Sequence, residues 1–197
     1  MSELIDLDVS EPIWEHFFSV YPLVLVGTRE ADGADDLAPK HLAMPLSWQN
    51  DFGFVCSPRH RTYQNILRTR QFAVSYARPS QAVLASLAAT PRCEDGSKPI
   101  TAALPVMPAR NIDAPLLEEA YLYLECELTR IYDDFGVNSL IAGRIVAARV
   151  AEDAMRESDL DDLDLVHHSP LLAYLYPGRF TSIDRSQQLP FPKDFRR

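Results

Sequence analysis

The sequence predicts a mainly β protein, an antiparallel barrel or sandwich covered by a few peripheral helices. Two observations predict it: most apolar segments have the length and pattern of strands, and most neighbouring strands are separated by short turns. A chain of 197 residues, 47% of them hydrophobic and 24% charged, has the ordinary make-up of a folded domain. We therefore expect a single domain over residues 1–197.

The N-terminal half combines apolar strand-like runs with short helical patterns. Strands are expected over residues 22–28, 37–48, 52–57 and 71–77, and helices over about 10–20, 62–70 and 79–90. Ser10 and Ser80 are candidate N-caps of the first and third helices. Pro39 and Pro45 lack a backbone N–H, so the strand over 37–48 is expected to be an edge or bulged strand.

The C-terminal half contains two long strands and one long irregular segment. The strands cover residues 120–133 and 138–153, and a tight turn at 134–136 joins them into a hairpin. The segment 91–115 holds five prolines, and loops of that length are usually lids, binding loops or dimer contacts. The segment 176–184 closes the fold, and the Pro-rich tail over about 186–197 is expected to be irregular.

The overall charge excludes several classes of partner. A net charge of -9 argues against nucleic acid and against anionic membrane surfaces as partners. No apolar run is long enough to cross a bilayer, and the acidic start lacks the layout of a signal peptide. A cytoplasmic location is the resulting expectation.

One loop is basic although the chain as a whole is acidic. No Asp or Glu occurs between Asp51 and Glu94, whereas six arginines do. The loop leaves a strand at Ser57 and enters a helix near Thr62, and a helix N-terminus favours phosphate through its free N–H groups. Arg59 and Arg61 would add charge-assisted hydrogen bonds, and His60 is a further candidate. The alternative is a solvated basic surface with Thr62 serving only as a cap.

A second candidate segment precedes this loop. A proline-interrupted strand leaves backbone groups unpaired, and those of Ala38, Pro39, Lys40 and His41 could bind the polar edge of a flat heterocycle. A ring at this position with its phosphate at Ser57–Thr62 would suit flavin mononucleotide (FMN).

The order of segments resembles the flavin reductase-like family of FMN-binding split barrels. The matching stretches are "YPLVLVGT", "DDLAPKH", "FGFVCSPRHRTYQNI" and "QFAVSY", followed by the segment from "KPITAALP" to "LECEL", "GVNSLIAGRIVAARV" and "SPLLAYLYPGRF". Together they extend roughly from Val20 to Ile183. The ordered set carries the resemblance, and no single stretch does so alone.

The resemblance implies a six-stranded antiparallel split β-barrel of Greek-key type that forms a homodimer, with FMN near the subunit interface. It also implies that residues 36–41 line the isoalloxazine and that Ser57, Arg59, Arg61 and Thr62 hold the phosphate. Relatives commonly move a hydride from NADH or NADPH to flavin and on to a small-molecule acceptor. Asp36 and His41 depart from the usual asparagine and small hydroxyl residue, and His41 is a candidate for tuning the flavin.

Three alternatives remain open from the sequence. One is a pyridoxamine-phosphate-oxidase-like enzyme on the same barrel, the second is a non-catalytic flavin-binding or sensing module, and the third is a phosphate site for another ligand. A metal site is not expected. The acidic stretch with Asp161, Asp162, Asp164, His167 and His168 lacks ligand spacing, because neighbouring histidines in an extended segment point to opposite faces.

Overall fold

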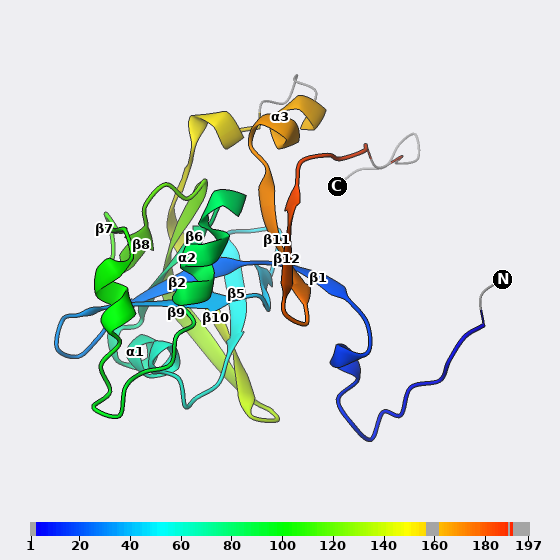
Figure 1. Cartoon of the computed structure of the whole chain (residues 1–197). Helices are drawn as coiled ribbons and strands as arrows, with labels where there is room; N and C mark the ends of the chain where they lie inside the picture. The colour runs from blue at the N-terminus through cyan, green and yellow to red at the C-terminus, as the bar shows by residue number, and fades with distance from the viewer. Residues whose placement is uncertain (1–2, 157–161, 189, 191–197) are drawn as a thin grey trace.

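The computed structural model describes residues 3–156, 162–188 and 190, which form three antiparallel sheets (Figure 1). The main sheet has seven strands in the order β3-β2-β6-β9-β10-β5-β4, a second has the order β1-β11-β12, and β7 pairs with β8. Strand bounds are β1 Ser19–Pro22, β2 Val24–Arg29, β3 Asp35–Lys40, β4 Ala43–Pro45, β5 Asp51–Cys56, β6 Gln71–Tyr76, β7 Val106–Pro108, β8 Pro115–Leu117, β9 Leu122–Phe135, β10 Asn138–Val150, β11 Leu171–Tyr176 and β12 Arg179–Ile183. The prediction of a mainly β, split-barrel fold is confirmed, with seven strands in the main sheet instead of six.

The main sheet is curled because its two edge strands are consecutive in the chain. β3 ends at Lys40 and β4 begins at Ala43, yet the two strands occupy opposite ends of the strand order. Two connecting residues span only a few ångströms, so the edges must lie close together. The single strand expected over 37–48 is therefore wrong: the chain changes edge at His41 and Leu42.

The curled sheet carries apolar cores on both faces. Val24 and Val26 of β2 pack inside the barrel with Phe54 and Phe72, and all four side chains are fully buried. Leu25, which points to the opposite face, packs beneath α2 (Ala82–Leu87) with Leu37, Ala85 and Leu117. This burial on both faces explains why β2 is a continuous apolar run.

β9 and β10 form a long hairpin that extends past the rest of the sheet (Figure 1). Three register shifts interrupt their pairing, which lets long strands bend around the barrel. Leu124, Cys126 and Leu128 alternate into the core as expected. Glu125 on the other face is also buried, and it accepts hydrogen bonds from the backbone N–H groups of Arg110 (3.1 Å) and Asn111 (2.6 Å).

Helices differ more from the sequence expectations. The helix expected over 10–20 is wrong: only Ile13–Glu15 form a 3-10 turn, and the chain before β1 runs away from the sheet (Figure 1). Ser80 is not an N-cap, because a 3-10 turn over Pro79–Gln81 precedes α2 and Gln81 bonds the N–H of Arg78 instead. The two adjacent histidines belong to α3 (Asp162–His168), not to an extended segment. The predicted tail falls largely outside the described residues.

The three remaining short elements are 3-10 turns over Pro99–Ala103 and Glu152–Ala154 and the helix α1 (Arg61–Thr69). α1 lies beside β2 and β3, and its start faces the segment 88–98. Within the residues that the structure describes, no helix is both long and apolar enough to cross a membrane.

Candidate functional site

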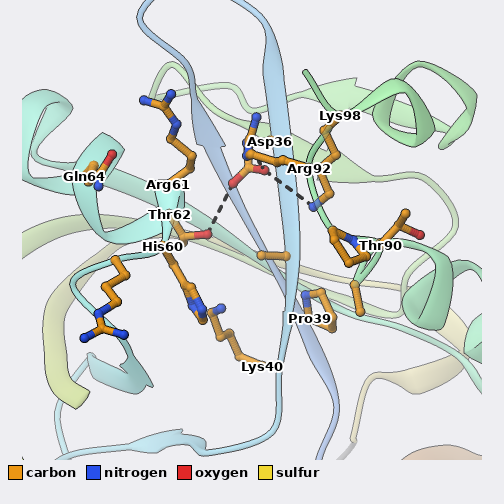
Figure 2. Close-up of a pocket in the computed structure, with 15 residues that line it drawn as sticks. Asp36, Pro39, Lys40, His60, Arg61, Thr62, Gln64, Thr90, Arg92 and Lys98 are labelled. Atoms are coloured by element: carbon orange, nitrogen blue, oxygen red, sulfur yellow. Dashed lines mark hydrogen bonds and ion pairs between the residues drawn. The ribbon is translucent and has the colours of Figure 1, made fainter. Parts of the chain in front are cut away.

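A pocket of about 640 Å³ lies where β3 meets the start of α1, beneath the segment that follows α2 (Figure 2). Most of the residues predicted from the sequence line it. Its wall is made by Asp36, Ala38, Pro39, Lys40, Arg59, His60, Arg61, Thr62, Gln64, Ala88, Ala89, Thr90, Pro91, Arg92 and Lys98. Six of these side chains are basic residue types and one is a carboxylate, so the wall is basic although the chain is acidic.

α1 is held in place by one amphipathic face. Tyr63 and Ile66 are buried in the barrel core, and the Asn65 side chain donates a hydrogen bond to the Thr28 hydroxyl of β2 at 3.1 Å. His60 is the N-cap residue, with extended backbone and no side-chain hydrogen bond that caps the helix. The start of α1, with Arg59, His60 and Arg61, therefore borders the pocket.

Thr62 differs from its predicted role. It lies inside the first turn, not at the N-cap, and its hydroxyl donates a hydrogen bond to Asp36 Oδ2 at 3.2 Å (Figure 2). The hydroxyl is thus engaged by the protein, although Thr62 still lines the pocket.

Asp36 is the centre of a buried charge cluster. Only 3% of the residue is exposed, and its carboxylate pairs with Arg92 at 2.9 Å and Lys98 at 3.6 Å. Figure 2 shows Asp36 between Thr62 on one side and the chain that carries Arg92 and Lys98 on the other. A carboxylate held in this way is neutralised by its own neighbours and does not present a free charge to a ligand in the pocket.

Arg92 and Lys98 were not predicted as site residues. Arg92 also pairs with Glu30 and donates to the Gly96 carbonyl at 2.9 Å, while Lys98 donates to the Leu37 carbonyl at 2.8 Å. One signal was present, because Arg92 is the last of the six arginines in the acid-free window. The other five divide between two roles: Arg59 and Arg61 line the pocket, whereas Arg68, Arg70 and Arg78 bond elsewhere in the fold.

Three cationic side chains remain available at the pocket. Among the described residues, Lys40, Arg59 and Arg61 form no ion pair with a carboxylate. His60 lies beside Lys40 (Figure 2), and burial together with the positive charge of Lys40 lowers the pKa of His60. His60 therefore favours its neutral form and can donate or accept one hydrogen bond. Ser57 does not line the pocket, and its hydroxyl accepts the Arg59 N–H at 3.4 Å.

His41 faces a different, smaller pocket. This pocket of about 350 Å³ includes Tyr174, Arg179 and Phe180, and it shares Pro39 and Ala89 with the main one. The His41 ring lies 4.9 Å from that of Tyr174 and 5.6 Å from those of Tyr21 and Tyr176. Burial and then Lys40 lower the pKa of His41, so a protonated His41 beside a flavin is disfavoured.

Within residues 3–156, 162–188 and 190, no cluster of three or more His, Cys, Asp or Glu side chains could hold a metal ion. Asp161 lies outside the described residues. His168 Nδ1 is 2.7 Å from the backbone carbonyl of Asp164, within α3.

Comparison with solved structures shows the same fold. Nitrilotriacetate monooxygenase component B from Bacillus cereus is 17% identical with a TM-score of 0.81, covering 96% of this chain and 100% of its own. Pseudomonas fluorescens 2-nitrobenzoate 2-nitroreductase NbaA is 22% identical with a TM-score of 0.79, covering 97% and 95%. The FMN-binding protein from Thermus thermophilus is 21% identical with a TM-score of 0.75, covering 96% and 100%.

Sequence comparison assigns the family. An uncharacterized protein from Methanothermobacter thermautotrophicus is 27% identical over 155 residues, which covers 77% of this chain and 73% of that protein. The flavin reductase like domain matches residues 18–183, most of the chain and all strands of the three sheets. The chain therefore belongs to the flavin reductase like domain family.

Proposed function

We propose that the main pocket binds FMN and that the protein is a flavin-dependent oxidoreductase. The observation that carries this proposal is that Arg59 and Arg61, which pair with no carboxylate among the described residues, lie at the pocket wall where α1 begins. A phosphate monoester suits this donor set, because two guanidinium groups and a helix N-terminus each favour a divalent anion.

The wall beside this anion site suits a flat polar heterocycle. β3 is an edge strand that pairs only with β2, so alternate residues along the stretch that includes Ala38 and Lys40 keep backbone groups that no second strand uses. Pro39 supplies an apolar face between them without a competing N–H. We place the isoalloxazine along Ala38–Lys40, with the phosphate at Arg59–Thr62.

The names of the structural neighbours support a flavin as the ligand. The Thermus thermophilus neighbour is named an FMN-binding protein, and the Pseudomonas fluorescens neighbour is named a nitroreductase. Bound FMN would supply hydride-accepting chemistry, with NADH or NADPH as a transient donor. The chain itself binds the phosphate, orients the ring against β3 and excludes water beneath the 88–98 segment. No general acid or base is needed for this role.

We also propose that the protein forms a homodimer. Phe18 and Val20 at β1 and Met44 of β4 are exposed apolar side chains on neighbouring strands. Trp48, just after β4, is 96% exposed. Exposed apolar patches of this kind mark contact surfaces, and a second copy of the chain is the proposed occupant.

Anaerobic reduction tests the activity. The FMN-loaded protein should lose its visible flavin absorbance on addition of NADH or NADPH, and regain it with oxygen or a nitroaromatic acceptor. Bleaching by neither donor, together with hydrogen peroxide formation from amines, would favour the pyridoxamine-phosphate-oxidase-like alternative. Flavin that binds but is never reduced would favour a sensing module.

A further inference from the structure

The smaller pocket, which His41 lines, adjoins the proposed ring site and is separate from the proposed phosphate site. It lies between α2 and the β11–β12 hairpin (Figure 1), and its volume of about 350 Å³ is at the small end of the range for small-molecule sites. It shares Pro39 and Ala89 with the main pocket, whereas none of the residues 59–62 lines it. A ligand in this pocket would therefore lie beside the flavin ring and away from the FMN phosphate.

The wall of the smaller pocket is mostly aromatic and apolar. Three rings line it, those of His41, Tyr174 and Phe180, and the first two have their centroids 4.9 Å apart. The other lining residues are Leu23, Pro39, Ala82, Ala85, Ser86, Ala89, Gly178 and Arg179. Phe180 is 59% exposed, so its ring keeps apolar surface that a ligand can cover. Flat aromatic ligands suit such a wall, because aromatic rings attract one another in offset or edge-to-face contact.

The charge of this wall restricts the ligand further. None of its lining residues is Asp or Glu, although the chain has 28 acidic residues, and Arg179 is the one Arg or Lys among them. Within the described part of the chain, Arg179 forms no ion pair with a carboxylate. A cationic ligand would be repelled by this guanidinium, whereas an anionic one would be attracted.

A carboxylate is the anion that fits this position best. An arginine side chain can bind a carboxylate through two parallel hydrogen bonds. A carboxylate carries a single charge, so it loses less hydration beside an apolar wall than the dianion of a phosphate monoester does.

A polar group on the ligand ring would also find a partner. The Tyr174 hydroxyl accepts the Gly178 N–H at 2.9 Å, and both residues line the pocket. No described residue accepts the Tyr174 O–H, which therefore remains available to a ligand. His41, which burial and Lys40 keep neutral by lowering its pKa, can donate or accept one further hydrogen bond.

We propose that the smaller pocket binds an aromatic carboxylate, with its ring against Tyr174 and Phe180 and its carboxylate at Arg179. This inference names the substrate class of the proposed flavin site, and it therefore rests on the proposed function. Its physical basis is the combination of exposed aromatic surface, an unpaired guanidinium and the absence of carboxylates from the lining residues.

Calorimetric titration of the FMN-loaded full chain with benzoate tests the site. Benzoate should bind at least about tenfold more tightly than benzamide, which has the same ring without the charge. Arg179→Gln should reduce benzoate affinity at least about tenfold and leave benzamide affinity unchanged. Phe180→Leu should weaken both ligands, because both use the ring. Arg185→Gln is the matched control, since Arg185 is also exposed but lines neither pocket.

The same titrations locate the ligand. Benzoate should perturb the visible spectrum of bound FMN without displacing the flavin. If Arg61→Ala abolishes benzoate binding and Arg179→Gln does not, benzoate occupies the main pocket and the inference is wrong. Equal benzoate affinities for wild type and Arg179→Gln would overturn it as well.

Two further outcomes separate this inference from the function beneath it. If FMN binds but benzoate does not, the inference fails and the flavin proposal stands. If FMN does not bind but the FMN-free chain binds benzoate through Arg179, the proposed function fails and the pocket is a binding site for aromatic acids alone.

Discussion

Arg61 lines the main pocket, and its side chain pairs with no carboxylate among the described residues. Arg61→Ala should weaken FMN binding by about 1.5–3 kcal/mol, the scale of a charge-assisted hydrogen bond. Arg68→Ala is the matched control on the same helix, because Arg68 bonds the Arg29 carbonyl outside the pocket. Titration with FMN measures both variants. Equal FMN affinities for Arg61→Ala and wild type would show that this loop does not bind the FMN phosphate.

His41 makes stability depend on pH. Burial and Lys40 lower its pKa below the ordinary 6.5, so the unfolded chain takes up the proton at higher pH than the folded one. The stability that neutral His41 contributes is complete above pH 6.5 and is lost as pH falls towards the folded pKa. His60 acts in the same direction.

We therefore expect the thermal midpoint of unfolding to decrease as the pH is lowered from about 7.5 to 5.5. The decrease should be smaller in His41→Phe. Phenylalanine keeps the aromatic contacts with Tyr174 and Tyr176 while removing the titrating group. Calorimetry at a series of pH values measures the two slopes. Identical slopes would show that His41 does not titrate within this range.

Individual site residues were predictable only where they are close in sequence. Arg59, His60 and Arg61 follow one another at a strand-to-helix transition, so local chemistry indicated their role. Arg92 and Lys98 reach Asp36 across more than fifty residues, which no local pattern reveals. The tyrosines around His41 come from β1 and β11, strands whose pairing is a property of the whole fold.

At the scale of elements, the carboxylate of Asp36 connects the segment 88–98 to β3 and α1 through ion pairs and hydrogen bonds. Asp36 is fully enclosed by Arg92, Lys98 and the hydroxyls of Thr62 and Thr28. The Lys98 side chain is only 9% exposed, so it depends on this partner. Asp36→Asn would leave a nearly buried cation unpaired.

We expect Asp36→Asn to lower the free energy of unfolding by about 3 kcal/mol. Amide hydrogen exchange over residues 88–98 should accelerate as the segment loosens. Asp35→Asn is the control, because its pair with Arg29 is more exposed and pairs of that kind contribute about 0–1 kcal/mol. Urea unfolding gives the energies. A loss below about 0.5 kcal/mol for Asp36→Asn would mean that water already screens the cluster.

Strands were easier to predict than helices for a physical reason. Alternating or continuous apolar runs mark β2, β5, β6, β9 and β10 because each packs at least one face against a core. The N-terminal segment has helical spacing, but its apolar side chains find no core in this chain. Trp14 and Phe18 remain more than half exposed, so no packing offsets the cost of forming a helix there.

At the scale of the whole molecule, one short connection determines where the site lies. Residues 41–42 carry the chain between the two edges of the main sheet, and the proposed flavin wall precedes them directly. The sequence indicated a barrel through its strand pattern. That its two edges meet at His41 depends on strand order, which the pattern does not specify.

The exposed apolar surface at β1 and β4 predicts self-association. Light scattering of the purified protein should give twice the chain mass of 22.2 kDa, because burying Phe18, Val20 and Met44 against a second copy removes apolar area from water. Phe18→Glu should shift the population towards the single-chain mass. A wild-type protein that stays at 22.2 kDa at all concentrations would exclude this dimer.

The most direct test of the central claim is a visible-absorbance titration of the purified protein with FMN. The proposed pocket predicts a perturbed flavin spectrum that saturates near one FMN per chain, and competition by inorganic phosphate at the Arg59–Thr62 end. An unperturbed spectrum at every protein concentration would contradict flavin binding. The basic pocket would then belong to a different phosphate ligand.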